Sequence, residues 1–265
     1  MTSISFVIVT SGLDDHRMVE IVDSIERLFI PQYEIIIVGG QSTTVNKKNT
    51  IHIPFVENTP TPWLTRKKNL GVRFSQYEVC VVMHDYHVFE SDWYIEFEKF
   101  GTDWDICVQQ QFVMSKFGSY QGNGWRVGNI PGYPEIPYNF AVPWDITCFI
   151  PYAAIQGAYW VIKREKMLEH MLDETLLACH GDDIEWSSRV VPCWMGEKVN
   201  QSGLKIVANP KCITILNKEK EVSPCGSNNN EILKSLDWLW NKIRAGYRRP
   251  GVYHYEAVLN KVILY

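Results

Sequence analysis

Short apolar runs alternate with segments of helical periodicity in the first part of the chain. Ile4–Val9 and Glu34–Val38 are rich in β-branched residues, which is typical of strands buried on both faces of a parallel sheet. Between them, apolar residues recur every three or four positions over residues 16–29, which predicts a helix that Pro31 ends. These segments form one βαβ unit, whose crossover is expected to be right-handed.

The alternation continues to about residue 216. Further strands are expected at residues 51–55, 78–83, 106–112, 158–162, 204–208 and 213–216, and further helices at residues 63–76, 164–177 and 182–190. This order predicts a single α/β domain over residues 1–220, with a central, mostly parallel sheet flanked by helices. Amphipathic spacing over residues 231–245 predicts a helix within a C-terminal extension, residues 221–265, packed on that domain.

Residues 115–152 interrupt this pattern. They are rich in glycine and proline and carry several tyrosines and tryptophans. A connection this long inside a compact domain is usually functional or disordered, and its aromatic residues argue against disorder. We therefore predict that this segment is ordered, either as a flap or as an insert that binds one of the substrates.

Composition and charge narrow the class of protein. The chain has 265 residues, of which 46% are hydrophobic and 21% charged, as is ordinary for a globular protein. A net charge of −4 gives no basic footprint for nucleic acid. The seven cysteines are scattered without a Cys-x-x-Cys, which is typical of reduced thiols, and there is neither a signal peptide nor an apolar run of ~20 residues. We predict a cytoplasmic protein without a transmembrane segment.

Three polar or glycine-rich segments follow predicted strands. They are Thr10-Ser11-Gly12, Gly39-Gly40-Gln41-Ser42 and His84-Asp85-Tyr86-His87. Ligands of open α/β sheets bind beyond the carboxyl ends of the strands, so these segments converge on one edge if their strands are parallel.

Asp85 and His87 are candidate metal ligands. They lie two positions apart just past a buried strand, so a continuing extended chain would point both side chains the same way. Carboxylate plus imidazole suits Mn²⁺ and related divalent ions, which neutralise a diphosphate and act as Lewis acids. From spacing alone, a polar turn with solvated side chains is an equally good interpretation.

The order of these motifs resembles GT-A-fold glycosyltransferases, most closely the family-two enzymes. The resemblance covers roughly residues 3–217. It rests on four segments, Phe6-Val7-Ile8-Val9-Thr10, Glu34 to Gly40, Lys68-Asn69-Leu70-Gly71 and Met83 to His87, and on a later pair, Gly157 to Ile162 and Gly181 to Arg189. It implies a GT-A-like enzyme that moves a sugar, with inversion, from a nucleoside diphosphate sugar of the UDP or GDP type to a hydroxyl acceptor, a saccharide or glycan.

The resemblance also implies residue roles. The donor nucleotide sugar would lie against Thr10, Ser11, Gly12, Gly39, Lys68, Asn69 and Asp85. Asp85 and His87 would match the family's Asp-x-Asp motif and hold Mn²⁺ or Mg²⁺. The family's late metal-binding histidine has no obvious counterpart, so Asn217, His254 or water would substitute. Independently of the resemblance, the flat apolar faces of Trp125, Tyr138 and Trp144 in the insert suit stacking on acceptor sugars, although packing onto the sheet explains any one of them equally well.

Asp183 would match the family's catalytic base, with Asp182 in reserve because adjacent acids align ambiguously. A base of this kind takes the proton of the acceptor hydroxyl during attack, and a predicted helix start favours its ionised form. Without the resemblance, Asp182 as an N-cap and Asp183 as a first-turn acid would be the better interpretation.

Two departures from the family leave alternatives open. Gly39-Gly40 stands where the family usually has an acidic residue, and the Asp-x-His variant is known in retaining GT-A enzymes, which weakens any stereochemical conclusion. A degenerate GT-A-like protein that binds sugar or nucleotide without catalysis is one alternative. A nucleotidyltransferase is another, but the segment Thr10-Ser11-Gly12-Leu13 lacks the glycine-rich basic loop that such enzymes carry.

Overall fold

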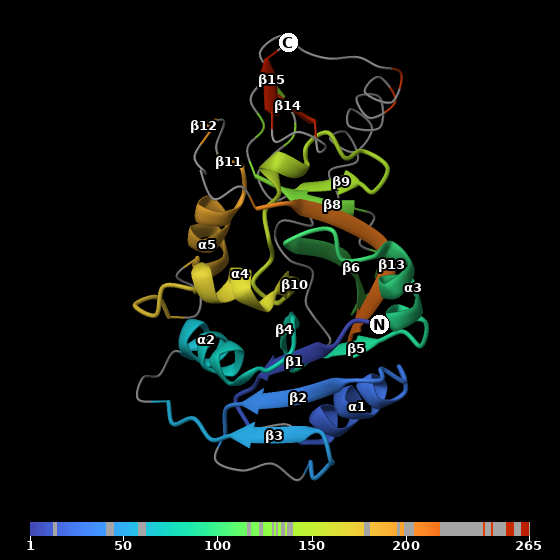
Figure 1. Ribbon diagram of the computed structural model, residues 1–265, viewed down its shortest axis with the longest axis vertical. Helices are drawn as coiled ribbons and strands as arrows, with labels where there is room; N and C mark the ends of the chain where they lie inside the picture. The colour runs from blue at the N-terminus through green and yellow to red at the C-terminus, as the bar shows by residue number, and fades with distance from the viewer. Residues whose placement is uncertain are drawn as a thin grey trace.

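The computed structural model describes residues 1–12, 15–40, 45–57, 62–115, 118–121, 124–128, 130, 132–133, 136, 140–177, 181–194, 197–198, 204–217, 241, 245, 253–256 and 261–264. Its main sheet has the strand order β3-β2-β1-β4-β10-β6-β13-β5, with β7 beside β6 (Figure 1). The strands of this sheet are β1 (Ile4–Val9), β2 (Tyr33–Val38), β3 (Thr50–Ile53), β4 (Val79–His84), β5 (His87–Phe89), β6 (Ile106–Ser115), β7 (Gly118–Gln121), β10 (Tyr159–Lys163) and β13 (Ile206–Leu216).

The helices are α1 (Asp15–Glu26), α2 (Leu64–Phe74), α3 (Trp93–Phe100), α4 (Arg164–Glu169) and α5 (Asp182–Val190), with a 3₁₀ turn at Ile150–Tyr152. Three small antiparallel pairs complete the described elements: β8 (Gly124–Val127) with β9 (Phe140–Pro143), β11 (Cys193–Trp194) with β12 (Glu197–Lys198), and β14 (Tyr253–Glu256) with β15 (Lys261–Leu264). None of the helices in this described part of the chain has the length and apolar character needed to span a bilayer.

Strand direction divides the sheet into two parts. The strands β3, β2, β1 and β4 are all parallel to one another, as the βαβ pattern predicted. β10 then runs antiparallel to both of its neighbours, β4 and β6, while β6 and β13 are again parallel. The sheet as a whole is therefore mixed, and the predicted parallel order holds mainly for its first half.

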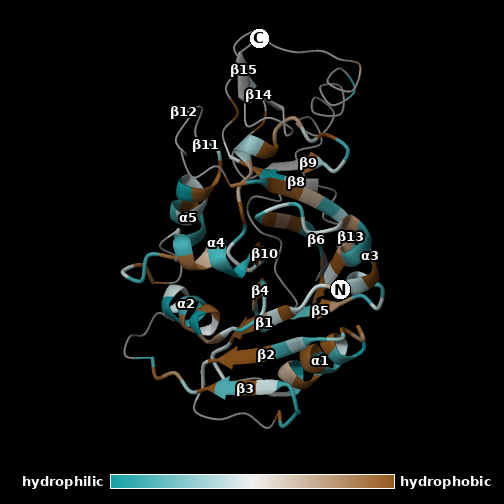
Figure 2. Cartoon of the chain, in the orientation of Figure 1, coloured by the Kyte–Doolittle hydropathy of each residue, from teal (hydrophilic) through white to brown (hydrophobic). Residues whose placement is uncertain are grey.

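Alternate side chains of the central strands pack into two separate hydrophobic cores, one on each face of the sheet. Phe6, Ile8 and Val81 face the core under α1 and α3. Val7 and Val82 face the second core, which also takes in residues of α2, α4 and α5. Figure 1 shows these two groups of helices on opposite sides of the sheet, and Figure 2 shows the hydrophobic strands between them. Burial on both faces explains why the strands read as continuous apolar runs.

Some predicted elements differ from the structure. The helix expected over residues 164–177 ends at Glu169, and the two strands expected after residue 204 form one strand, β13, with an irregularity between Asn209 and Ile213. The short elements β5 and α3 were not predicted. The helix predicted at 231–245 lies almost entirely outside the described residues, and the domain boundary at residue 220 stays a prediction.

Candidate active site

The carboxyl ends of β1, β2 and β4 lie side by side. Val9 is in register with Val38 on one side and with His84 on the other. The segments that follow these three residues therefore meet at one edge of the sheet, as predicted from their order in the sequence. We call this the strand-end edge.

Thr10 links two of the three segments. Its hydroxyl accepts a hydrogen bond from the amide of Gly12 (3.0 Å) and donates one to the Oδ2 atom of Asp85 (2.6 Å). The Gly12 amide can only donate, so the hydroxyl proton is directed to the carboxylate. This arrangement orients Asp85, whose other oxygen has no hydrogen-bond partner among the described residues.

Backbone contact joins the loops after β1 and β2. Gly39 has a φ of 132°, and a Cβ atom at this position would lie 1.9 Å from the carbonyl oxygen of Thr10. Gly12 has a φ of 79°, and its Cβ would lie 2.5 Å from the Cα of Gly40. Only glycine tolerates such an approach, which explains why no acidic residue stands at Gly39.

Asp85 and Tyr86 form a turn, so the extended geometry expected for this segment is wrong. The amide of Tyr86 donates to the carbonyl of His84 (2.9 Å), and the chain re-enters the sheet at His87, the first residue of β5. His87 is fully buried, and its ring lies 4.9 Å from that of Tyr86 and 5.1 Å from that of Tyr159. Burial also raises the pKa of the Tyr86 phenol.

These residues fit a divalent cation in part. Asp85 offers a half-buried, oriented carboxylate, which is a suitable ligand for Mn²⁺ or Mg²⁺. The imidazole of His87 is enclosed by aromatic rings, and its role as a second ligand stays a prediction. The described residues contain no group of three His, Cys, Asp or Glu side chains arranged around a common point. Asn217 does lie beside this turn. Its backbone amide donates to the carbonyl of Tyr86 (2.8 Å), and its side-chain amide donates to the carboxylate of Glu20.

Three consecutive polar residues of α2 are buried and bonded within the protein. Lys67 donates to the carbonyl of Thr10 (2.9 Å) and forms an ion pair with Glu57 (2.5 Å). Lys68 instead bonds the carbonyl of Gly157, in the turn before β10, and the carboxylate of Asp182, at the start of α5. Asn69 holds the chain beyond α4 by accepting from the amide of Leu172 (3.0 Å) and donating to its carbonyl (2.8 Å). Contact of Lys68 and Asn69 with a donor therefore stays a prediction, because both are fully buried.

The two acids at the start of α5 have different surroundings. Asp182 is buried and forms an ion pair with Lys68, with 3.1 Å between Oδ2 and Nζ. Asp183 is half-buried, and its Oδ2 accepts a hydrogen bond from the amide of Gly157 (3.2 Å) while its Oδ1 accepts one from Ile184 (2.9 Å). Only Asp183 thus combines accessibility with a fixed orientation.

Asp183 is connected to the segment that carries Asp85 through the turn before β10. The amide of His84, which precedes Asp85, donates to the carbonyl of Ala158 (3.0 Å). Ala158 follows Gly157, and Gly157 bonds Asp183. The turn before β10 therefore connects the strand-end edge to α5. Sequence reasoning gave Gly157 no role, although it noted the segment that contains it.

The aromatic residues of the insert are only partly described. The backbone of Trp125 lies in β8, but its side chain and all of Tyr138 fall outside the described residues. Trp144 is half-buried and packs against the core that includes Tyr133 and Phe149. Stacking of any of these three predicted residues on an acceptor stays a prediction.

Comparison with known proteins places the fold. No protein-family model matches the sequence, nor does any curated protein. Among solved structures, the chain is similar to GalNAc-T7 with UDP, GalNAc and Mn2+, at a TM-score of 0.60 and 16% identity over 91% of this chain and 50% of that one. A weaker similarity, at a TM-score of 0.48 and 12% identity, relates 83% of this chain to 59% of S. aureus TarS 1-349. The chain thus spans between half and three fifths of the lengths of these proteins, and the first likeness shows a GT-A-like fold, as predicted.

Proposed function

We propose that this protein is a glycosyltransferase that moves a sugar from a nucleoside diphosphate sugar, of the UDP or GDP type, to a hydroxyl group of a saccharide or glycan. One observation carries the proposal. Within a GT-A-like fold, one turn, Gly157-Ala158, bonds both the backbone of His84, which precedes the oriented carboxylate of Asp85, and the accessible carboxylate of Asp183. One carboxylate serves the diphosphate side of the reaction, and the other serves the acceptor side.

The donor would lie at the strand-end edge. Ser11 and Gly12 are exposed there, next to Thr10, and suit contact with the base and ribose. Gly39 contributes by letting the two loops approach closely. Asp85, with His87 as the predicted second ligand, would hold Mn²⁺ or Mg²⁺. When bound, such an ion neutralises the departing diphosphate and acts as a Lewis acid. The Mn2+ and UDP present with GalNAc-T7 make these the first ligands to test.

Asp183 would act as the general base. Its two oxygens accept hydrogen bonds from the backbone amides of Gly157 and Ile184, which hold the carboxylate in one orientation at the first turn of α5. A carboxylate placed in this way removes the proton of the acceptor hydroxyl as the sugar is attacked from the opposite side of the leaving group, with inversion.

Binding experiments test the donor site. We expect UDP or GDP to bind in calorimetric titrations and to bind more tightly with Mn²⁺ than without it. Failure of both nucleotides to bind under every condition would exclude the proposed function. Nucleotide binding without turnover of any common nucleotide sugar would instead favour the non-catalytic alternative.

A matched pair of variants on one helix turn tests the base. Asp183→Asn should leave UDP binding intact and lower turnover by roughly 10²- to 10⁴-fold. Glu185→Gln is the control, because Glu185 pairs with Arg189 on the surface of the same helix and should leave both quantities unchanged. Full turnover in Asp183→Asn would show that another group is the base.

A further inference from the structure

Lys68 is a fully buried cation whose ammonium bonds the start of α5 and the turn before β10. Its Nζ donates to the carbonyl of Gly157 (2.8 Å) and to Oδ2 of Asp182 (3.1 Å). The ammonium also lies 4.9 Å from the centre of the Trp160 ring, a distance at which the ring face attracts a cation. A carbonyl, a carboxylate and an aromatic face thus surround one ammonium group.

Stability alone does not account for this arrangement. Taking a lysine and an aspartate out of water carries a desolvation penalty, and replacing a buried ion pair by apolar residues of similar volume is often neutral or stabilising. Burial also lowers the pKa of Lys68, and the nearby carboxylates of Asp182 and, more weakly, Asp183 oppose that shift. The pair is therefore better explained by the geometry that it imposes.

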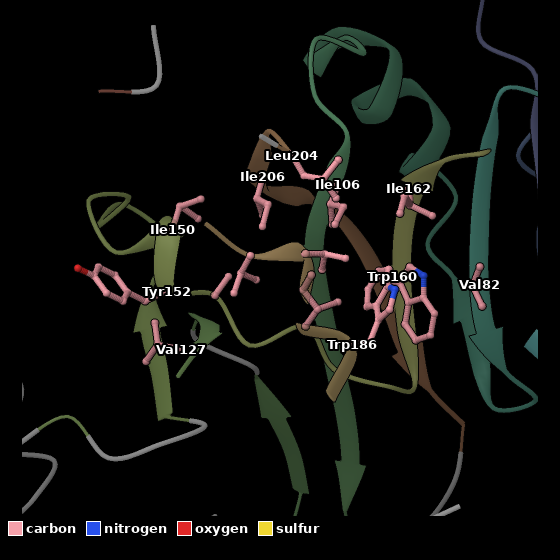
Figure 3. Close-up of a cluster of buried hydrophobic side chains, with 14 of the residues drawn as sticks. Val82, Ile106, Val127, Ile150, Tyr152, Trp160, Ile162, Trp186, Leu204 and Ile206 are labelled. Carbon is pink, nitrogen blue, oxygen red and sulfur yellow. The ribbon is translucent and has the colours of Figure 1, made fainter. Parts of the chain in front are cut away.

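The bonds of Lys68 lead to Asp183 by two routes. The first passes through Gly157, which accepts from Lys68 with its carbonyl and donates to Asp183 with its amide. The second passes through Asp182, the residue next to Asp183 at the start of α5. Trp160 completes the frame, since its ring stacks on Trp186 of α5 with 5.1 Å between centroids (Figure 3). Lys68 thus joins α2, the turn before β10 and α5 at the point where Asp183 is presented.

The neighbouring residue, Lys67, is also a buried lysine but has different partners. Lys67 is buried to the same degree, but its ammonium bonds Thr10 and Glu57 at the strand-end edge. Consecutive residues of one helix therefore point to the two halves of the site, Lys67 to the donor half and Lys68 to the half that holds Asp183.

We propose that Lys68 is a positioning residue for Asp183, and that its ion pair with Asp182 and its bond to Gly157 fix the carboxylate of Asp183 for proton abstraction. This rests on the proposed function. It gives Asp182 a supporting role instead of a catalytic one, and it gives Lys68 a role in turnover instead of in donor affinity.

Lys68→Met and Lys67→Met in the full chain separate these roles. The readouts are UDP affinity with Mn²⁺ and the rate of hydrolysis of whichever of UDP-glucose, UDP-galactose, UDP-N-acetylglucosamine and UDP-N-acetylgalactosamine the wild type hydrolyses fastest. Lys68→Met should lower kcat by roughly 10- to 100-fold and leave UDP affinity unchanged. Lys67→Met should weaken UDP binding by roughly 10-fold. Weakened UDP binding in Lys68→Met with an unchanged kcat would overturn the proposal.

The double variant Lys68→Met/Asp182→Leu separates positioning from stability. Removing both charges relieves the desolvation penalty, so its melting temperature should return toward that of the wild type while kcat stays low. Recovery of kcat together with melting temperature would show that Lys68 only stabilises the fold, and would overturn the proposal. A wild type that binds neither UDP nor GDP, with or without Mn²⁺, marks instead the failure of the proposed function.

A pH profile of the wild type gives a test that needs no variant to fold. The charged groups that face Lys68 are Asp182 and Asp183, both on α5, and β10 presents only the neutral ring of Trp160. Deprotonation of Lys68 should weaken its contacts with Asp182 and Gly157. The value of kcat should therefore fall at alkaline pH, before the ordinary lysine pKa of about 10.4 is reached. This alkaline fall should be absent from the double variant. A wild-type kcat that stays constant up to that pH would contradict the proposal.

Discussion

The strand-end edge and the Lys68 cluster, formed by Lys68, Gly157, Trp160 and Asp182, are the two halves of the proposed site, and they are held together by different forces. At the edge, the loops after β1 and β2 touch through backbone atoms, and a single short hydroxyl, that of Thr10, orients Asp85. In the cluster, a long buried cation spans the distance between α2 and α5, and Asp183 is oriented through it.

This difference predicts different sensitivities. The edge has no room for an added methyl group, so substitutions that add side-chain volume there should lower stability and UDP binding. The Lys68 cluster depends on charges and on backbone hydrogen bonds over a longer distance. Removal of the charge of Lys68, or a small displacement of Asp183, should therefore lower kcat. Variants that add volume at one position, or remove a polar group at another, test this difference.

The largest effect is expected for Gly39→Ala. The new Cβ would need to lie 1.9 Å from the carbonyl oxygen of Thr10, and the φ of 132° is unfavourable for alanine. Backbone strain costs about 1–3 kcal/mol and overpacking about 1–3 kcal/mol more. We expect a fall of roughly 10 °C in melting temperature, together with loss of UDP binding.

Gly101→Ala is the matched control for that substitution. Gly101 also has a positive φ, 79°, but a Cβ atom there would meet nothing within 4 Å, and it lies beyond α3, at the opposite end of the sheet. Gly101→Ala should therefore lower the melting temperature only by the cost of backbone strain, and it should leave UDP binding intact. Equal losses in the two variants would mean that close approach does not distinguish the strand-end edge.

A smaller effect is expected for Thr10→Val, which keeps the shape and removes the hydroxyl. Asp85 loses its donor and the amide of Gly12 loses its acceptor, at a cost of about 1–3 kcal/mol in the free energy of unfolding. Loss of an outer partner of a metal ligand typically lowers metal affinity by roughly 10- to 100-fold, so the Mn²⁺-dependent part of UDP binding should weaken.

Thr10→Ser retains the hydroxyl and should bind Mn²⁺ and UDP almost as the wild type does. Calorimetric titration with UDP, with and without Mn²⁺, separates two roles of Thr10. If Thr10→Val weakens UDP equally in both conditions, Thr10 contacts the nucleotide directly and does not act through Asp85.

Local pattern predicted which strand ends meet at the strand-end edge, but it predicted neither the turn at Asp85-Tyr86 nor the Lys68 cluster. Buried strands of β-branched residues predicted β1, β2 and β4, and their common direction placed Thr10 and Asp85 together. By contrast, Lys68 and Asp182 are 114 positions apart, and nothing near either residue in the sequence indicates the other. The early end of α4 has a similar cause, since Asn69 bonds Leu172 from a distant helix and tertiary contacts override local helical periodicity there.

The smallest effect on stability, but a specific effect on turnover, is expected for Gly157→Ala. A Cβ atom there would lie 3.1 Å from the Cβ and 3.4 Å from the Cγ of Asp183, so that side chain must give by a few tenths of an ångström. Because alanine also restricts the unfolded chain, which stabilises proteins by about 0.4–1 kcal/mol, the melting temperature should hardly change. The bond from Lys68 to the Gly157 carbonyl is retained, yet the displaced carboxylate should lower kcat by roughly 10-fold at constant UDP affinity. An unchanged kcat would mean that turnover tolerates this displacement of Asp183, and that the cluster is less exacting than the strand-end edge.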